Sequence, residues 1–165
     1  MDERIITTRG LGCQSGDRFL LKNIDWEIEE KSRWIILGMN GCGKTTLLSM
    51  LAGYQDYTHG DIFYRGVNYR QQNILEIRKK MGLISNSYFD RIYHNESVMD
   101  LVLSGLSGTL GLEDGSISAA HIRKLKRLLE HVGLSDRLDS SYSWLSKGER
   151  QNILILRALL SQPEV

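Results

Sequence analysis

Residues 34–48 read WIILGMNGCGKTTLL. The four residues from Trp34 to Leu37 are apolar and typical of a buried strand, and the apolar residues after Lys44 are typical of a helix. Between Gly38 and Thr45 lies Gly-x-x-x-x-Gly-Lys-Thr, the P-loop pattern. Glycine adopts backbone angles, and allows a close approach, that a side chain would forbid. The stretch therefore predicts a strand, a phosphate-binding turn and a helix in succession.

This turn supplies candidate ligands for a nucleoside triphosphate. Its N–H groups converge on one point, where the N-terminus of the following helix adds about half a positive charge. The Lys44 ammonium can reach the β- and γ-phosphates, and the Thr45 hydroxyl can bind Mg²⁺. The residues expected around the nucleotide are Asn40, Gly41, Cys42, Gly43, Lys44, Thr45 and Thr46.

The composition is that of an ordinary globular domain of 165 residues, with 41% hydrophobic and 25% charged residues. A net charge of +1 gives no electrostatic reason to expect nucleic acid or an anionic membrane as partner. Cys13 and Cys42 make neither a disulfide framework nor a zinc pattern, which favours a reducing compartment. No apolar run has the length of a membrane span, and no signal-peptide region follows Met1.

Hydrophobic periodicity predicts the remaining elements. Strands are expected over residues 4–8, 20–28, 60–66 and 81–85, with a turn over residues 10–16. The P-loop helix is expected to run to about Ala52, before Gly53. Further helices are expected over residues 98–103, capped by Asn95 or Ser97, then over 122–132 and 152–160, with a loop over 104–115. Four cations between residues 123 and 127 lie mostly opposite the apolar face of their helix, either in solvent or against a partner.

A second motif stands at residues 145–151, which read LSKGERQ. Ser146 and Glu149 have the spacing of a capping box, which makes Ser146 the N-cap of the apolar helix that follows. One interpretation is that the box only starts this helix. The other is a phosphate site, because the N-terminus of a helix beside a glycine, here Gly148, attracts anions.

The P-loop, the helical insert and LSKGE about 100 residues later together resemble the ATP-binding-cassette (ABC) ATPases. The resemblance covers nearly the whole chain and is strongest to bacterial ATP-binding subunits of importers and related soluble ABC proteins. It implies an α/β P-loop NTPase core with an N-terminal antiparallel β portion and an all-helical insert. The implied division is an ATP-binding core over residues 1–86, a helical subdomain over 87–145, and the signature motif with its helix over 146–165.

The resemblance also implies a function. Two such domains, identical or paralogous, pair head to tail and hold MgATP between the P-loop of one and the signature of the other. Ser146 and the Gly148 N–H would then touch the γ-phosphate held by the partner chain. Hydrolysis by this ATPase would drive a membrane permease, which places the subunit in the cytoplasm, peripheral to the membrane. No nucleic-acid partner is implied.

Three positions depart from the family pattern. Lys147 stands where the signature has its first glycine. Asn86 stands where a glutamine contacts Mg²⁺ and the attacking water, so a catalytic and metal-binding role falls to its shorter amide. Cys13 stands where an aromatic residue stacks on adenine, and the nearest aromatic candidate is Phe19.

The fourth departure concerns the end of the sequence. In the family, the Walker B strand with its acidic residues follows the segment matching residues 162–165, and here the sequence stops. The expectation is a fragment that lacks the C-terminal part of the core sheet and hydrolyses ATP slowly, if at all, on its own. The segment 34–37 would then have open edges, and would pair with another copy, distort, or depend on further sequence.

Three alternatives stay open from sequence alone. The chain could belong to a soluble ABC protein of translation, repair or regulation, or could bind ATP without turnover. A P-loop kinase is disfavoured, because it has no use for the signature or the insert. Cys42 is either a reactive thiol at a helix N-terminus beside Lys44 or an inert small residue.

Overall fold

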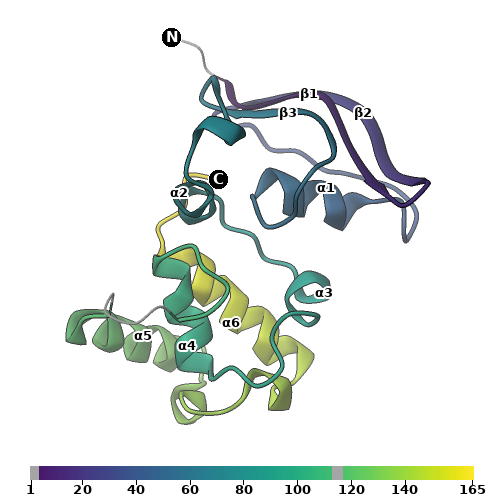
Figure 1. Ribbon diagram of the computed structural model, residues 1–165. Coiled ribbons are helices and arrows are strands. Elements are labelled where there is room, and N and C mark those ends of the chain that lie inside the picture. Colours follow the sequence, from purple (N-terminus) through teal and green to yellow (C-terminus); the bar gives the residue numbers. More distant parts are fainter. Residues whose placement is uncertain (1–3, 113–116) are drawn as a thin grey trace. The chain divides into compact units, whose positions relative to one another are not determined.

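The computed structural model describes residues 4–112 and 117–165 (Figure 1). The chain forms two compact units, the first extending to Ile77 and the second beginning at Arg78. Each unit has its own buried core. Among the described residues, no helix is both long enough and apolar enough to cross a bilayer.

The first unit contains an antiparallel sheet with the strand order β2-β1-β3-β4. The long strands β1 (Arg4–Ser15) and β2 (Arg18–Glu29) form a hairpin (Figure 1). A shorter hairpin is formed by β3 (His59–Tyr64) and β4 (Val67–Asn68). The turn predicted over residues 10–16 is wrong, because β1 continues to Ser15 through several register shifts. Such register shifts allow β1 to include Gly10, whose φ is 56°, without ending its hydrogen-bonded pairing with the neighbouring strands.

The helical part of the first unit begins with α1 (Lys44–Leu51), as the P-loop pattern predicts. Ala52 caps its C-terminus, and Gly53 follows with φ of 74°. Next come the 3₁₀ turn η1 (Tyr69–Gln71) and α2 (Ile74–Lys80), within which the first unit ends at Ile77. The Tyr69 hydroxyl donates a 2.6 Å hydrogen bond to the Leu51 carbonyl, so η1 is tied to the end of α1.

The strands predicted over residues 34–37 and 81–85 are absent. Three apolar side chains of the first segment are largely exposed, Trp34 at 58%, Ile35 at 85% and Leu37 at 87%, as is Met39 two residues beyond it at 84%. An apolar run forms a strand only where neighbouring backbone accepts and donates its ladder hydrogen bonds. The described sheet places no strand beside residues 34–37, so the segment stays irregular, with Trp34 packed edge-on against Trp26 at 5.3 Å.

The second unit is helical (Figure 1). Its elements are α3 (Asn86–Phe89), α4 (Val98–Leu103), η2 (Ser104–Leu106), α5 (Ala119–His131), η3 (Ser135–Arg137), η4 (Tyr142–Trp144) and α6 (Lys147–Leu160). The helices predicted over residues 98–103, 122–132 and 152–160 are confirmed, the last two with earlier starts. Ser97 caps α4 by accepting from the Asp100 N–H at 3.0 Å.

The core of this unit lies where α4 packs against α6. Apolar side chains of both helices are fully buried, among them Val98, Leu101, Ile153 and Leu154. Arg157 is only 2% exposed and lies among them. Its guanidinium donates to the Thr109 carbonyl at 2.8 Å and lies 5.0 Å from the centre of the Phe89 ring.

Although residues 81–85 do not form the predicted strand, the backbone on either side of Met81 is hydrogen-bonded to Val165 in a parallel arrangement. The Val165 N–H donates to the Lys80 carbonyl at 3.1 Å, and the Gly82 N–H donates to the Val165 carbonyl at 2.7 Å. This alternation around Met81 is the hydrogen-bond pattern of a parallel bridge. Both ends of the second unit therefore lie in direct hydrogen-bond contact.

Candidate nucleotide-binding site

The P-loop closes around the ammonium group of its own lysine. Lys44 Nζ donates to the carbonyl oxygens of Gly38 at 2.7 Å and Met39 at 2.8 Å, and lies 3.7 Å from Cys42 Sγ. These contacts curl the loop back on the first turn of α1. The predicted site residues from Asn40 to Thr46 are thus brought together in one turn.

Glycine is required at Gly43 for two reasons. Its φ is 97°, which side chains rarely adopt. A Cβ atom there would also lie 2.7 Å from Leu21 Cδ2 and 3.1 Å from the Leu20 carbonyl oxygen. Gly41 differs, because its φ of 79° needs glycine while the space beside it is open. The loop therefore packs on β2 at Gly43 and leaves open space at Gly41.

The donors at the start of α1 suit a phosphate. Gly43 is the N-cap and provides no side-chain hydrogen bond, so the first N–H groups of the helix have no side-chain cap. Within the part of the chain that the structure describes, the Thr45 side chain has no hydrogen-bond partner. A hydroxyl oxygen is a hard ligand of the kind that Mg²⁺ accepts together with phosphate oxygens. The described residues contain no cluster of three His, Cys, Asp or Glu that could hold a metal without such help.

Phe19 is an exposed aromatic side chain on β2, the strand against which Gly43 packs. It stands on β2 two residues before Leu21, is 40% exposed, and has the His59 ring at 5.4 Å and Lys22 Nζ at 5.3 Å from its own ring. Cys13 is buried and so presents no stacking surface. Sequence reasoning missed His59, because β3 brings it to Phe19 from 40 positions away and no local pattern signals that pairing.

The signature segment forms the N-terminus of α6, and the predicted capping box is present. Ser146 Oγ accepts from the Glu149 N–H at 3.3 Å, and Glu149 Oε2 accepts from the Ser146 N–H at 2.7 Å. These hydrogen bonds, helped by Arg137 at 3.6 Å, lower the pKa of the Glu149 carboxyl. The box thus holds Ser146 in a fixed position at the first turn.

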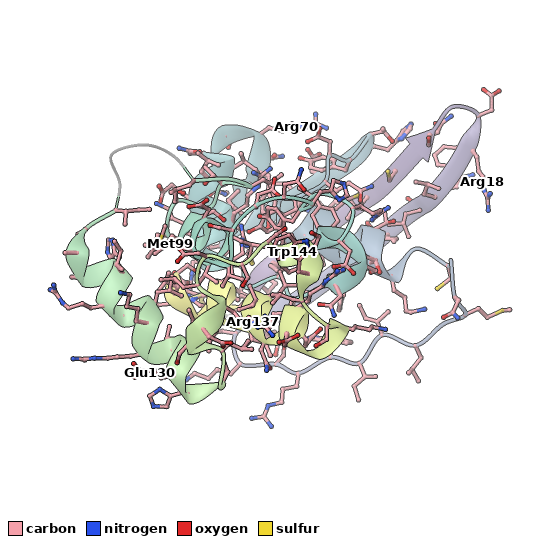
Figure 2. The ribbon with its side chains drawn as sticks, turned by 90° about the horizontal axis from the view of Figure 1, so that it is seen from below. Arg18, Arg70, Met99, Glu130, Arg137 and Trp144 are labelled. Carbon is pink, nitrogen blue, oxygen red and sulfur yellow. The ribbon has the colours of Figure 1, made fainter. Side chains whose placement is uncertain are left out.

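The rest of the signature faces open space. No atom lies within 4 Å of a Cβ placed on Gly148, and both Gly148 and Lys147 are exposed. Trp144, two residues before Ser146, is 83% exposed and is labelled in Figure 2. Trp144 was not singled out from sequence, since exposure cannot be read from a residue type. The N-terminus of α6 is therefore accessible to a large ligand or partner.

Asn86 belongs to the same unit as the signature. Its amide nitrogen donates to the Lys147 carbonyl at 3.2 Å, across 61 positions of sequence. Its Oδ1 is buried and has no hydrogen-bond partner among the described residues. An orphaned amide oxygen is a potential metal ligand, but it becomes accessible only if the side chain turns. The metal-binding and catalytic roles of Asn86 stay predictions.

The sequence profile of the ABC transporter family matches residues 21–165, a span that includes the P-loop, Asn86 and the signature. The chain belongs to the ABC transporter family. This ABC chain is 35% identical over 162 residues to the uncharacterized ABC transporter ATP-binding protein YlmA of Bacillus subtilis, covering 98% of this chain and 61% of YlmA. It is 31% identical over 160 residues to the maltose/maltodextrin import ATP-binding protein MalK of Photorhabdus laumondii, covering 97% of this chain and 41% of MalK. The chain thus spans about three fifths of YlmA, and less of MalK.

Solved ABC structures share the fold of this chain. A dimeric bacterial ABC transporter cassette aligns with a TM-score of 0.75 at 22% identity, over 96% of this chain and 71% of that one. A bacterial Atm1-family exporter with ATP bound aligns with a TM-score of 0.68 at 22% identity, over 97% of this chain and 28% of the exporter. The predicted α/β fold of the ABC ATPase type is confirmed.

Proposed function

We propose that this chain is the nucleotide-binding part of the ATP-binding subunit of an ABC transporter. The observation that supports this most directly is the P-loop itself, in which Lys44 is held at the centre of a glycine turn that opens α1. Its relatives include import ATP-binding proteins for maltose/maltodextrin and for L-cystine, which favours transport over a soluble role.

In this proposal each residue of the turn has a defined task. The N–H groups from Gly41 to Thr46 bind the phosphates, assisted by the positive end of α1. Lys44 leaves its loop carbonyls and binds the β- and γ-phosphates. Thr45 gives its hydroxyl oxygen to Mg²⁺, which when bound neutralises charge on the phosphate oxygens. Phe19 stacks on the base, with His59 beside it.

In this proposal the signature segment contacts a second nucleotide, which is bound to another ABC domain. Ser146 and the Gly148 N–H meet the γ-phosphate held by another ABC domain, identical or paralogous, in a head-to-tail pair. Because the γ-phosphate is lost on hydrolysis, it stabilises the closed pair only before turnover. The difference in stability of the closed pair before and after hydrolysis is what drives the permease. Hydrolysis also needs an ordered water, for which Asn86 is the candidate here. The subunit works at the cytoplasmic face of the membrane.

Nucleotide binding by the chain tests this proposal. We expect a fluorescent ATP analogue to bind with Mg²⁺, and Lys44→Ala to weaken binding about 10- to 100-fold, the loss typical of a charge-assisted contact. Lys31→Ala is the matched control, because Lys31 is an exposed lysine outside the turn. Equal affinities of wild type and Lys44→Ala, with Lys31→Ala also unchanged, would remove the P-loop from the proposal.

A further inference from the structure

Helix α5 has an outer face on which cations gather. We call Arg123, Lys124, Arg127 and His131 the basic stripe. With Ala120 and Leu128 they line a shallow hollow of about 410 Å³ along nearly three turns of the helix. Figure 2 shows nitrogen-tipped side chains projecting from α5, the helix on which Glu130 is labelled.

Three cations of α5 lack the partners that some cations elsewhere in the chain have. Arg4 pairs with Glu27 at 2.9 Å, and Arg150 pairs with Asp90 at 3.3 Å. Within residues 4–112 and 117–165, by contrast, the side chains of three members of the stripe, Arg123, Lys124 and Arg127, make no ion pair, hydrogen bond or ring contact. Their mutual repulsion is thus left uncompensated by the fold.

Acidic residues lie beside the stripe but outside its hollow. A neighbouring depression is lined by Lys126, Glu130, Ser135, Asp136, Leu138 and Asp139, where three carboxylates face one ammonium. Among the described residues that line the hollow of the stripe there is no carboxylate. The positive potential is therefore local, and the net charge of +1 conceals it.

The stripe sits on a rigid support. Leu125 and Leu129 on the inner face of α5 are buried. The N-terminus is capped by Ser118 and His121, whose backbone and side chains exchange hydrogen bonds at 3.3 and 3.4 Å. At the other end, His131 Nδ1 donates to the Arg127 carbonyl at 2.6 Å, which fixes the ring against the helix. The cations are thus presented on one face with a fixed spacing.

We propose that the basic stripe binds the anionic surface of a lipid bilayer, with lipid phosphates in the hollow. Each Lys or Arg of an amphipathic helix that lies near an anionic leaflet adds to the attraction, and the stripe supplies three of them. An acidic polypeptide has the same charge, but the cytoplasmic loops of membrane proteins carry an excess of Lys and Arg, so such loops are poor partners for this face. The bilayer is the better match.

Co-sedimentation with vesicles tests the proposal. The full chain is mixed with vesicles of equal parts phosphatidylglycerol and phosphatidylcholine, or of phosphatidylcholine alone. We expect binding to the anionic vesicles only, weakened by added salt, and at least about tenfold weaker for the double variant Lys124→Glu/Arg127→Glu. The control Arg18→Glu/Arg33→Glu changes the net charge equally at exposed positions off α5, and should bind like wild type.

The remaining measurements distinguish an anionic bilayer from other sources of negative charge. A second variant, Lys124→Gln/Arg127→Gln, removes the same two charges without reversing them. We expect it to weaken vesicle binding to an intermediate degree, and circular dichroism checks that its helix content is kept. Failure to bind anionic vesicles, or an equal loss in the Arg18/Arg33 control, would overturn the proposal. So would displacement by millimolar inorganic phosphate, or by poly-glutamate, at matched ionic strength. Binding of the fluorescent ATP analogue is measured on the same variants, and stays unchanged whatever the vesicle result.

Discussion

The Lys44 ammonium group illustrates how a single residue connects the shape of the P-loop to its chemistry. Its two short hydrogen bonds go to neutral carbonyl oxygens of Gly38 and Met39. A triphosphate offers charged oxygens, so the hydrogen bonds of Lys44, whose donor is already ionised, would gain an ionised acceptor and the attraction between opposite charges. Exchange of partners therefore favours the bound state, while the carbonyl contacts hold the lysine in place beforehand.

A substitution at Gly148 should affect the stability of α6 and its proposed role in dimerisation in opposite directions. Because no described atom lies within 4 Å of the position that a Cβ would take, Gly148→Ala should fold and should raise the free energy of unfolding by up to about 1 kcal/mol, the difference in helix propensity. The added methyl group would, however, stand between the Gly148 N–H and a phosphate of the partner chain. We expect a higher Tm together with weaker ATP-dependent dimerisation, measured by analytical ultracentrifugation. Unchanged dimerisation would contradict the role proposed for Gly148.

Glu149 gives the signature a defined dependence on pH. Its pKa is lowered in the folded chain by the capping-box hydrogen bonds to Ser146, so the ionised carboxylate stabilises the fold. This contribution is present above the unfolded-state pKa of about 4.3 and is lost as the pH falls through the lower folded-state pKa. Glu149→Gln keeps the box but not the charge. Urea unfolding should show wild type more stable at neutral pH and the difference vanishing on acidification; a constant difference would refute this.

Cys42 offers a chemical probe of the P-loop. The thiol is exposed, and its sulfur lies 3.7 Å from Lys44 Nζ in the turn where phosphate is expected. Bound MgATP should cover it and slow alkylation several-fold, as followed by mass spectrometry. The buried Cys13 serves as an internal control, because its slow reaction should not change. Equal alkylation rates of Cys42 with and without MgATP would place the phosphates elsewhere.

At the scale of elements, η2 and α6 approach each other through Gly105. A Cβ on Gly105 would lie 2.4 Å from the Arg157 carbonyl oxygen, a backbone atom that cannot move aside cheaply. Gly105→Ala should therefore destabilise the chain by about 1–3 kcal/mol, as overpacking typically does. Gly111→Ala is the control, since nothing lies within 4 Å of its Cβ position. Similar Tm values for the two variants would show that η2 is not closely packed.

Local signals account for the elements that sequence predicted well. The capping box starts α6, Ser97 starts α4, and the apolar spacing of α5 buries Leu125 and Leu129. The segments 34–37 and 81–85 were predicted as strands because their residues are apolar, and that reasoning fails where no neighbouring strand is present. The P-loop residues were predictable from spacing alone. His59 and Trp144 were not, because their surroundings depend on strand pairing and exposure.

At the scale of the whole molecule, the exposed apolar segment after β2 should govern solution behaviour. Ile35 and Leu37 are 85% and 87% exposed, so replacing both with Lys removes no packing and should change the free energy of unfolding by less than about 1 kcal/mol. The loss of an exposed apolar patch should lower binding of the dye ANS and concentration-dependent light scattering.

The matched control adds the same two charges elsewhere. Gln71→Lys/Asn95→Lys changes exposed polar positions and should leave dye binding and scattering as in wild type. If the control suppresses scattering as strongly as the Ile35/Leu37 variant, net charge and not the apolar segment is responsible. If the Ile35/Leu37 variant loses its stability, these side chains are packed in solution.

The backbone contact of Lys80 and Gly82 with Val165 has a consequence for protein engineering. A segment whose entry and exit are hydrogen-bonded to each other can be spliced into a surface turn of an unrelated host without forcing the host's two flanking residues apart. Residues 80–165 should therefore be tolerated as an insert, and would carry the signature helix and the cationic face of α5 onto a scaffold that has neither.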